Sequence, residues 1–155
     1  MTEMVLGFYF ERFQDEWLVW LIRKNRPTWQ RGKLNGIGGH VEPDESPLRA
    51  MRREFREEAG LDIDNWVHAI TLNGPGWRVH IFRVFHWGYG PAHPSTQTDE
   101  TVSFYQTGAM FPRTLAIPNL EWIVPLLLDK EISPPVHMYA STHSGLGVLV
   151  QEGVD

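Results

Sequence analysis

Three glutamates near the middle of the chain, Glu54, Glu57 and Glu58, have the spacing of one helix face. At about 100° per residue, positions three and four apart lie on the same flank of a helix. A cluster of carboxylate oxygens is how proteins hold Mg²⁺ against a phosphate chain. Like charges this close repel one another, and a divalent cation would remove that penalty. A solvated acidic patch, balanced by neighbouring arginines, is the alternative interpretation.

The helix that carries these glutamates is predicted to begin after Ser46 and to end at Gly60. Ser46 is a favourable N-cap, Pro47 suits the first helical position, and glycine is a typical C-terminal stop. The face expected to be buried carries Leu48, Met51, Phe55 and Ala59. The face expected to meet solvent carries Arg49, Arg52 and Arg56. Ala50 falls among the glutamates, so no large side chain should obstruct that flank.

A glycine-rich segment, Asn35-Gly36-Ile37-Gly38-Gly39, precedes this helix. Glycines allow the backbone to approach a bound phosphate or to enter a strained turn. A tight connection between a strand and a helix would also need them. The segment and the acidic helix together favour a phosphate site.

Residues 39–61 resemble the Nudix box in every defined position. The pattern is Gly, five residues, Glu, seven residues, Arg-Glu, an apolar residue, any residue, Glu-Glu, any residue, Gly and an apolar residue. The residues that fill it are Gly39, Glu45, Arg53, Glu54, Phe55, Glu57, Glu58, Gly60 and Leu61. The match covers 23 of 155 residues, and it is specific for fold and reaction class but not for substrate.

The resemblance implies an α+β fold, a single-domain α/β/α sandwich with a mixed central β-sheet. It also implies hydrolysis of a nucleoside diphosphate linked to another moiety, with Mg²⁺ or Mn²⁺ as the cofactor. Carried over to this sequence, Glu54, Glu57 and Glu58 resemble metal ligands, and Arg53 resembles the residue that orients them. Glu45 would form a salt bridge with Arg53 rather than bind metal.

The resemblance extends to residues outside the acidic flank. The backbones of Gly38 and Gly39 would approach the metal or the phosphate. A later acidic residue often completes the metal site or serves as the base, and Glu100 occupies the corresponding position. A charged turn before a strand is the alternative reading of Asp99-Glu100.

The segment around Asn35 is similar to that of MutT-like triphosphatases, in which the corresponding asparagine contacts the base. Asn119 lies where those enzymes place a second base-reading residue, and a plain helix N-cap is its alternative role. Arg23 resembles a residue that contacts phosphate. An amide can offer both a donor and an acceptor to a purine edge. We therefore expect a (deoxy)nucleoside triphosphate, including oxidised purines, as the substrate.

Five basic residues occur within eleven positions, with no acidic residue among them. They are Arg23, Lys24, Arg26, Arg31 and Lys33. They would attract a polyphosphate, or they would simply form a solvated loop.

Three other functions stay open. Pro75 lies near where ADP-ribose hydrolases of the family carry a proline, although a turn explains it equally well. Dinucleoside polyphosphates are a further substrate class. A catalytically silent nucleotide-binding module is the third, and such modules usually lose a box glutamate or the arginine. The intact box argues against it.

The composition is ordinary for a globular chain of 155 residues, with 42% hydrophobic and 21% charged residues. This length predicts one domain over residues 1–155. The lack of cysteine excludes disulfides and thiolate metal sites and is typical of a cytoplasmic protein, and the N-terminus shows no signal peptide. A net charge of −5 argues against stable nucleic-acid binding, and no apolar run could span a membrane. We expect a monomer or homodimer that binds a small nucleotide.

Periodicity and turn residues predict the remaining elements. A hairpin is expected over residues 5–10 and 17–23, and a short strand over 36–41. Strands over 66–72 and 77–86 should be joined by Asn73-Gly74-Pro75-Gly76. A polar loop (88–99), a strand near 101–106, a helix from Asn119 to about Leu128 and a strand within 137–150 complete the chain.

Overall fold

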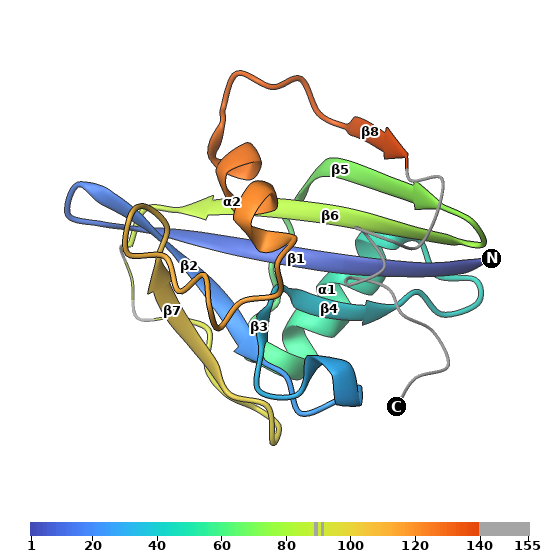
Figure 1. The fold of residues 1–155 in the computed structure, drawn as a ribbon, viewed down its shortest axis with the longest axis horizontal. Coiled ribbons are helices and arrows are strands. Elements are labelled where there is room, and N and C mark those ends of the chain that lie inside the picture. The colour runs from blue at the N-terminus through green and yellow to red at the C-terminus, as the bar shows by residue number, and fades with distance from the viewer. Residues whose placement is uncertain (89, 91, 140–155) are drawn as a thin grey trace.

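The computed structural model describes residues 1–88, 90 and 92–139. Eight strands and two α-helices make up the described part (Figure 1). The strands are β1 (Thr2–Phe13), β2 (Glu16–Arg23), β3 (Leu34–Asn35), β4 (Ile37–His40), β5 (Val67–Gly74), β6 (Trp77–His86), β7 (Val102–Gln106) and β8 (Val136–Tyr139). The helices are α1 (Pro47–Ala59), α2 (Leu120–Leu128) and a 3-10 turn, η1 (Thr28–Gln30).

The strands form one mixed sheet in the order β3-β2-β1-β6-β5-β8, with β4 paired to β1 and β7 paired to β2. The parallel pairs are β1–β6 and β5–β8, and the other pairs are antiparallel. One edge of β1 serves two partners, because residues 9–13 pair with β2 and residues 4–7 pair with β4. This arrangement holds the glycines of β4 against the middle of the sheet.

The two helices cover opposite faces of the sheet, which confirms the α/β/α sandwich (Figure 1). Successive side chains of a strand point to opposite faces, and β1 follows this rule. Val5 and Tyr9 belong to the hydrophobic cluster that contains Phe55 of α1, whereas Phe8 and Phe10 belong to the cluster under α2. The large strand side chains therefore supply both halves of the core.

Helix α1 begins and ends as predicted. The Ser46 hydroxyl accepts from the backbone N–H of Arg49 at 3.2 Å, and Gly60 adopts the left-handed conformation with a φ of 80°. The predicted buried face was wrong at one position: Leu48 is 41% exposed, whereas Ala50 is fully buried. Ala50 faces the core because its small side chain allows the helix to lie close to the sheet. Leu48, in the first turn, projects into solvent.

The predicted hairpins, the short strand before α1 and the strand near 101–106 are confirmed as β1–β2, β5–β6, β4 and β7. Asn119 occupies the N-cap position of α2, but the prediction that it caps the helix was wrong. Its backbone is in the α-helical region, and its side chain makes no cap hydrogen bond. The strand expected within 137–150 is β8, which begins at Val136; residues 140–150 lie outside the described part. No helix in that part has the length and apolarity needed to cross a membrane.

Candidate functional site

The site is built where β4 meets α1, and two glycines allow this approach. A Cβ added to Gly38 would lie far inside van der Waals contact with the backbone oxygen of Val5 on β1. A Cβ added to Gly39 would lie 2.6 Å from Oε1 of Glu54. Gly38 is thus required by strand pairing, whereas Gly39 makes room for a carboxylate.

Arg53 connects the acidic side chains of this region. Its Nε and Nη2 donate to the two carboxylate oxygens of Glu45 at 2.8 and 3.0 Å, which confirms the expected salt bridge. Its Nη1 donates to Glu54 at 2.9 Å and to Glu57 at 3.3 Å, and Nη2 also donates to the carbonyl of His40 at 3.0 Å. The hydrogen bond with Glu45 is the main cause that raises the pKa of the guanidinium. Arg53 therefore stays charged and holds its partners in fixed positions.

The three predicted metal ligands differ in environment. Burial raises the pKa of Glu54, against the opposing hydrogen bond from Arg53. Burial also raises the pKa of Glu58 to about 7, against the positive charge of Lys24, which lowers it. The side chain of Glu57 is 56% exposed, and the only ion pair it forms within the described part is with Arg53. The flank thus contains two desolvated carboxylates and one solvated carboxylate.

These residues fit a hard divalent cation in their chemistry. All are oxygen donors, which Mg²⁺ and Mn²⁺ prefer. Oε2 of Glu58 is buried and has no hydrogen-bond partner among the described residues, and a cation would satisfy such an oxygen. Their side chains have not converged, since no group of three or more Asp, Glu, His or Cys residues in the described part is close enough to hold a metal. Arg53 instead occupies oxygens of Glu54 and Glu57.

Glu100 lies beside this flank, and its negative charge contributes to the raised pKa of Glu58. It is 3% exposed, and both of its oxygens are engaged. Oε1 accepts from Nζ of Lys24 at 3.0 Å, and Oε2 accepts from the backbone N–H of Asn25 at 2.6 Å. The structure thus places Glu100 close enough to Glu58 for their charges to interact, as the partner of Lys24. Sequence reasoning missed this pairing, because no local pattern relates residues 76 positions apart.

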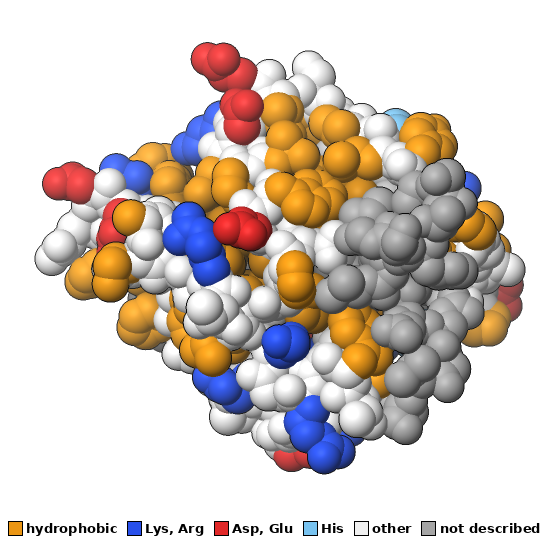
Figure 2. Space-filling view, viewed as in Figure 1, with side chains coloured by type: hydrophobic (Ala, Val, Ile, Leu, Met, Phe, Trp, Pro, Cys, Tyr) orange, Lys and Arg blue, Asp and Glu red, His pale blue; other side chains and the backbone are white. Residues whose placement is uncertain are grey.

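The five clustered basic residues do not act as one group. Lys24 pairs with Glu100, and Arg26 pairs with Asp99. Arg23 donates to the backbone carbonyl of Gly32 at 3.2 Å. On the face shown in Figure 2, Lys and Arg side chains lie as separate spots, and one spot near the centre lies against an Asp or Glu side chain. The sequence therefore overstated the free positive charge of this loop.

The two predicted base-reading residues lie on neighbouring segments. Leu34, next to Asn35, bridges to Ala116, and the N–H of Ile117 donates to the carbonyl of Leu34 at 2.9 Å. Asn35 and Asn119 are 5% and 3% exposed. Asn35 already donates to the side chain of Gln30 at 3.1 Å and accepts from the N–H of Gly36 at 2.8 Å. Gln30 is a buried polar residue that sequence reasoning did not single out.

The family model of the NUDIX domain matches residues 2–123 of this chain. No curated protein sequence matches it. Solved structures share the fold. A MutT/nudix family protein from Enterococcus faecalis superposes with a TM-score of 0.59 at 20% identity, over 68% of this chain and 43% of that one. This chain thus spans less than half of the length of that protein.

Two other solved structures are described with a nucleotide ligand or with a nucleotide-hydrolysing activity. The NUDIX domain of NrtR from Shewanella oneidensis, solved with ADP ribose, has a TM-score of 0.66 at 14% identity, over 81% of this chain and 84% of that one. An Ap4A hydrolase from C. elegans has a TM-score of 0.60 at 14% identity, over 82% and 93%. At these identities the likeness concerns the fold.

Proposed function

Since this chain belongs to the Nudix hydrolase family, whose members act on phosphoric anhydride bonds, we propose that it hydrolyses a (deoxy)nucleoside triphosphate to the monophosphate and pyrophosphate. The observation that carries the proposal is a buried oxygen of Glu58, beside the Arg53–Glu54 pair, that has no hydrogen-bond partner in the part of the chain that the structure describes. An orphaned carboxylate oxygen in a desolvated site is costly unless a cation binds there.

Glu54, Glu57 and Glu58 would hold Mg²⁺ or Mn²⁺. When bound, the ion supplies neutralisation of the phosphate oxygens and acidifies the attacking water. Arg53 keeps Glu54 oriented through its bidentate anchor on Glu45. The glycine backbone of β4 lets the Glu54 carboxylate lie directly against the strand.

Glu100 would act as a further ligand or as the proton acceptor. Its place beside Glu58 supports this role. The role requires that Oε1 be released from Lys24, whose ammonium is then available for a phosphate oxygen.

Asn35 and Asn119 would read the base, with Arg23 near the phosphates. Both amides are buried on adjoining segments, which suits a recessed base. A single hydrogen bond from one of these amides would decide between a normal and an oxidised purine.

ADP-ribose and dinucleoside polyphosphates are the alternative substrates of the same reaction class. The fold shared with an ADP-ribose-bound domain and with an Ap4A hydrolase supports keeping both. Pro75 gives ADP-ribose no added support, because it lies in the turn that joins β5 and β6.

A substrate panel tests the proposal. The protein is incubated with Mg²⁺ and normal or oxidised nucleoside triphosphates, ADP-ribose or dinucleoside polyphosphates, and released pyrophosphate and monophosphate are measured. We expect pyrophosphate from a triphosphate and none after chelation of the metal. Failure to form product from any nucleotide would instead favour a silent nucleotide-binding module.

A further inference from the structure

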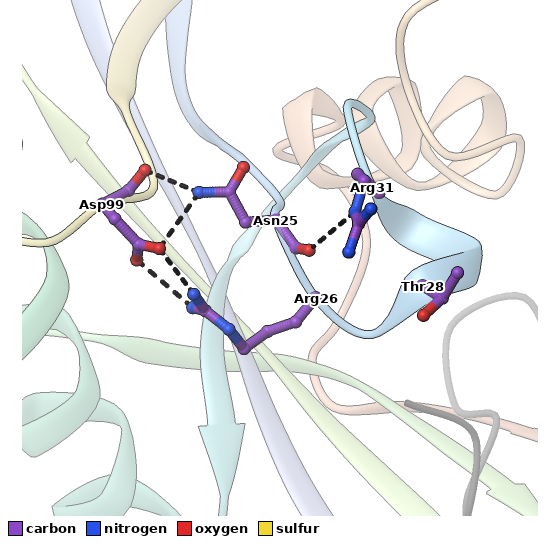
Figure 3. A pocket seen from close by; sticks show the side chains of 5 residues that line it. All are labelled: Asn25, Arg26, Thr28, Arg31 and Asp99. Carbon is purple, nitrogen blue, oxygen red and sulfur yellow. Dashed lines mark hydrogen bonds and ion pairs between the residues drawn. The ribbon is translucent and has the colours of Figure 1, made fainter.

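A second polar site adjoins the acidic flank. An open pocket of about 600 Å³ lies between the loop after β2 and the turn before β7 (Figure 3). The side chains that line it are Asn25, Arg26, Thr28, Arg31 and Asp99. Glu100, which follows Asp99 directly, is the residue that contacts Lys24 and lies near Glu58. Arg26, which lines the pocket, also lies 3.8 Å from Oε2 of Glu100, so the pocket adjoins the proposed reaction site.

The single carboxylate of the pocket is already neutralised. Nη1 and Nη2 of Arg26 donate to the two oxygens of Asp99 at 3.3 and 2.5 Å. The amide of Asn25 also donates to Asp99, to the carboxylate at 3.3 Å and to the backbone carbonyl at 2.7 Å. These contacts engage both carboxylate oxygens of Asp99, and its negative charge is balanced by Arg26.

Arg31 carries a positive charge that no carboxylate in the described part of the chain balances. Its guanidinium makes one hydrogen bond, from Nε to the carbonyl of Asn25 at 3.4 Å, and has no carboxylate partner in the described part of the chain. Thr28 is exposed and stands on the same side of the pocket as Arg31, away from Asp99 (Figure 3). The pocket thus offers a fork of N–H donors and a hydroxyl, which suits a phosphate group.

Among the described residues the lining contains no aromatic or aliphatic side chain, so it is unsuited to a nucleobase. We propose that this pocket binds the terminal phosphate of the substrate, with Arg31 as its cation and the Thr28 hydroxyl as a second donor. The inference rests on the proposed function and deepens it, since it assigns a subsite for polyphosphate rather than for a second sugar.

Binding of inorganic tripolyphosphate, followed by calorimetry, tests the subsite without turnover of a nucleotide. We expect Arg31→Met to weaken binding about tenfold, the size of one charge-assisted hydrogen bond. Thr28→Val keeps the shape of the side chain, and we expect it to weaken binding by roughly threefold. Affinity for dGMP, which lacks the terminal phosphates, should not change in either variant.

Arg56→Met is the matched control, because it removes one positive charge from an exposed position of α1 outside the pocket. Equal weakening in the Arg56 and Arg31 variants would show a general charge effect and overturn the subsite. Unchanged affinity in Arg31→Met, or no binding to the wild type, would also overturn it. If tripolyphosphate binds through Arg31 while no nucleotide is hydrolysed, the subsite stands and the proposed function fails.

Discussion

Arg53 shows how one side chain can organise several carboxylates. Its planar guanidinium contacts Glu45, Glu54 and Glu57 at once, and it is only 18% exposed in its side chain. A lysine would keep the charge but could not form the bidentate pair. The geometry of the acidic flank therefore depends on the shape of this side chain as much as on its charge.

For Arg53→Lys we expect a loss of kcat/KM of about 100-fold or more, because Glu54 would lose its fixed orientation. Steady-state pyrophosphate release measures this, and circular dichroism checks the fold. Arg49→Lys, at an exposed position of the same helix, should be active. Wild-type rates in the Arg53 variant would show that the salt-bridge network has no part in catalysis.

Lys24 should compete with a divalent cation for the carboxylates around it. Its Nζ lies 3.0 Å from Glu100, and its charge reaches Glu58. Since removal of a nearby positive charge favours a cation, we expect Lys24→Met to bind Mn²⁺ at least about fivefold more tightly. Electron paramagnetic resonance of free Mn²⁺ measures the affinity, with Lys33→Met as the control. Weaker binding would mean that Lys24 instead holds Glu100 in place for the metal.

Pairing at the residue scale was only partly predictable. The Glu45–Arg53 salt bridge lies within the motif and was expected, and Figure 3 shows a contact, Arg26 with Asp99, that was not. Such long-range pairs arise from the fold, because the loop after β2 and the turn before β7 lie at the same end of two antiparallel neighbouring strands. Spacing in the sequence holds no information on them.

The approach of β4 to α1 is the element-scale feature on which the site depends. The packing of α1 against β4 brings Glu54 next to the backbone of Gly39, and β1 pairs with β4 at Gly38. Gly38 is therefore needed for strand pairing and Gly39 for the position of the Glu54 carboxylate, and substitution of each glycine can distinguish these two roles.

We expect Gly38→Ala to destabilise the fold by about 3 kcal/mol or to prevent folding, because its Cβ would meet the backbone of Val5. Gly39→Ala should fold, since the Glu54 carboxylate can move away, but it should lose most activity. Thermal unfolding and activity assays distinguish these results. Gly108→Ala, with no atom near its Cβ, is the control. The idea is wrong if both site variants behave alike.

The elements themselves were largely predictable. The sequence alone predicted the alternating strands, the turn within residues 73–76 and the capped helix α1, because each follows a local rule. The rotation of α1 was not, since periodicity predicted Leu48 rather than Ala50 in the core. A local pattern cannot show that the sheet beneath this helix requires a small side chain at that position.

At the scale of the whole molecule, burial of ionisable groups links stability to pH. Burial lowers the pKa of His68, which contacts the ring of His80 and hydrogen-bonds to Thr71. The folded state therefore holds fewer protons than the unfolded state below about pH 6.5. The contribution of His68 to stability should therefore decrease as the pH falls through that value, whereas Glu58, whose pKa burial raises to about 7, contributes with the opposite sign.

Urea unfolding at a series of pH values tests this. We expect His68→Gln to raise the unfolding free energy at about pH 5 relative to that at about pH 7, compared with the wild type, by no more than about 1.4 kcal/mol per pH unit. His40→Gln, at an exposed position, is the control. An identical pH dependence in the His68 variant and in the wild type would rule out this group as the source.

The sheet topology could not be read from the sequence, and it decides the site. The parallel pairing of β1 with β6, and the two partners on the other edge of β1, join segments that lie far apart in the chain. The Nudix box allowed the family and the carboxylates to be predicted. The contacts of Lys24 and Gln30, and the pocket beside Asp99, became apparent only from the fold.

Glu57 gives the most direct test of the central claim, that the acidic flank of α1 holds the metal needed for hydrolysis. Its side chain is 56% exposed and contributes little to folding, so Glu57→Gln should change only the site. We expect its Mg²⁺-dependent rate of pyrophosphate release to fall by about 1,000-fold or more, with an unchanged circular dichroism spectrum. A rate close to that of the wild type would contradict the metal assignment.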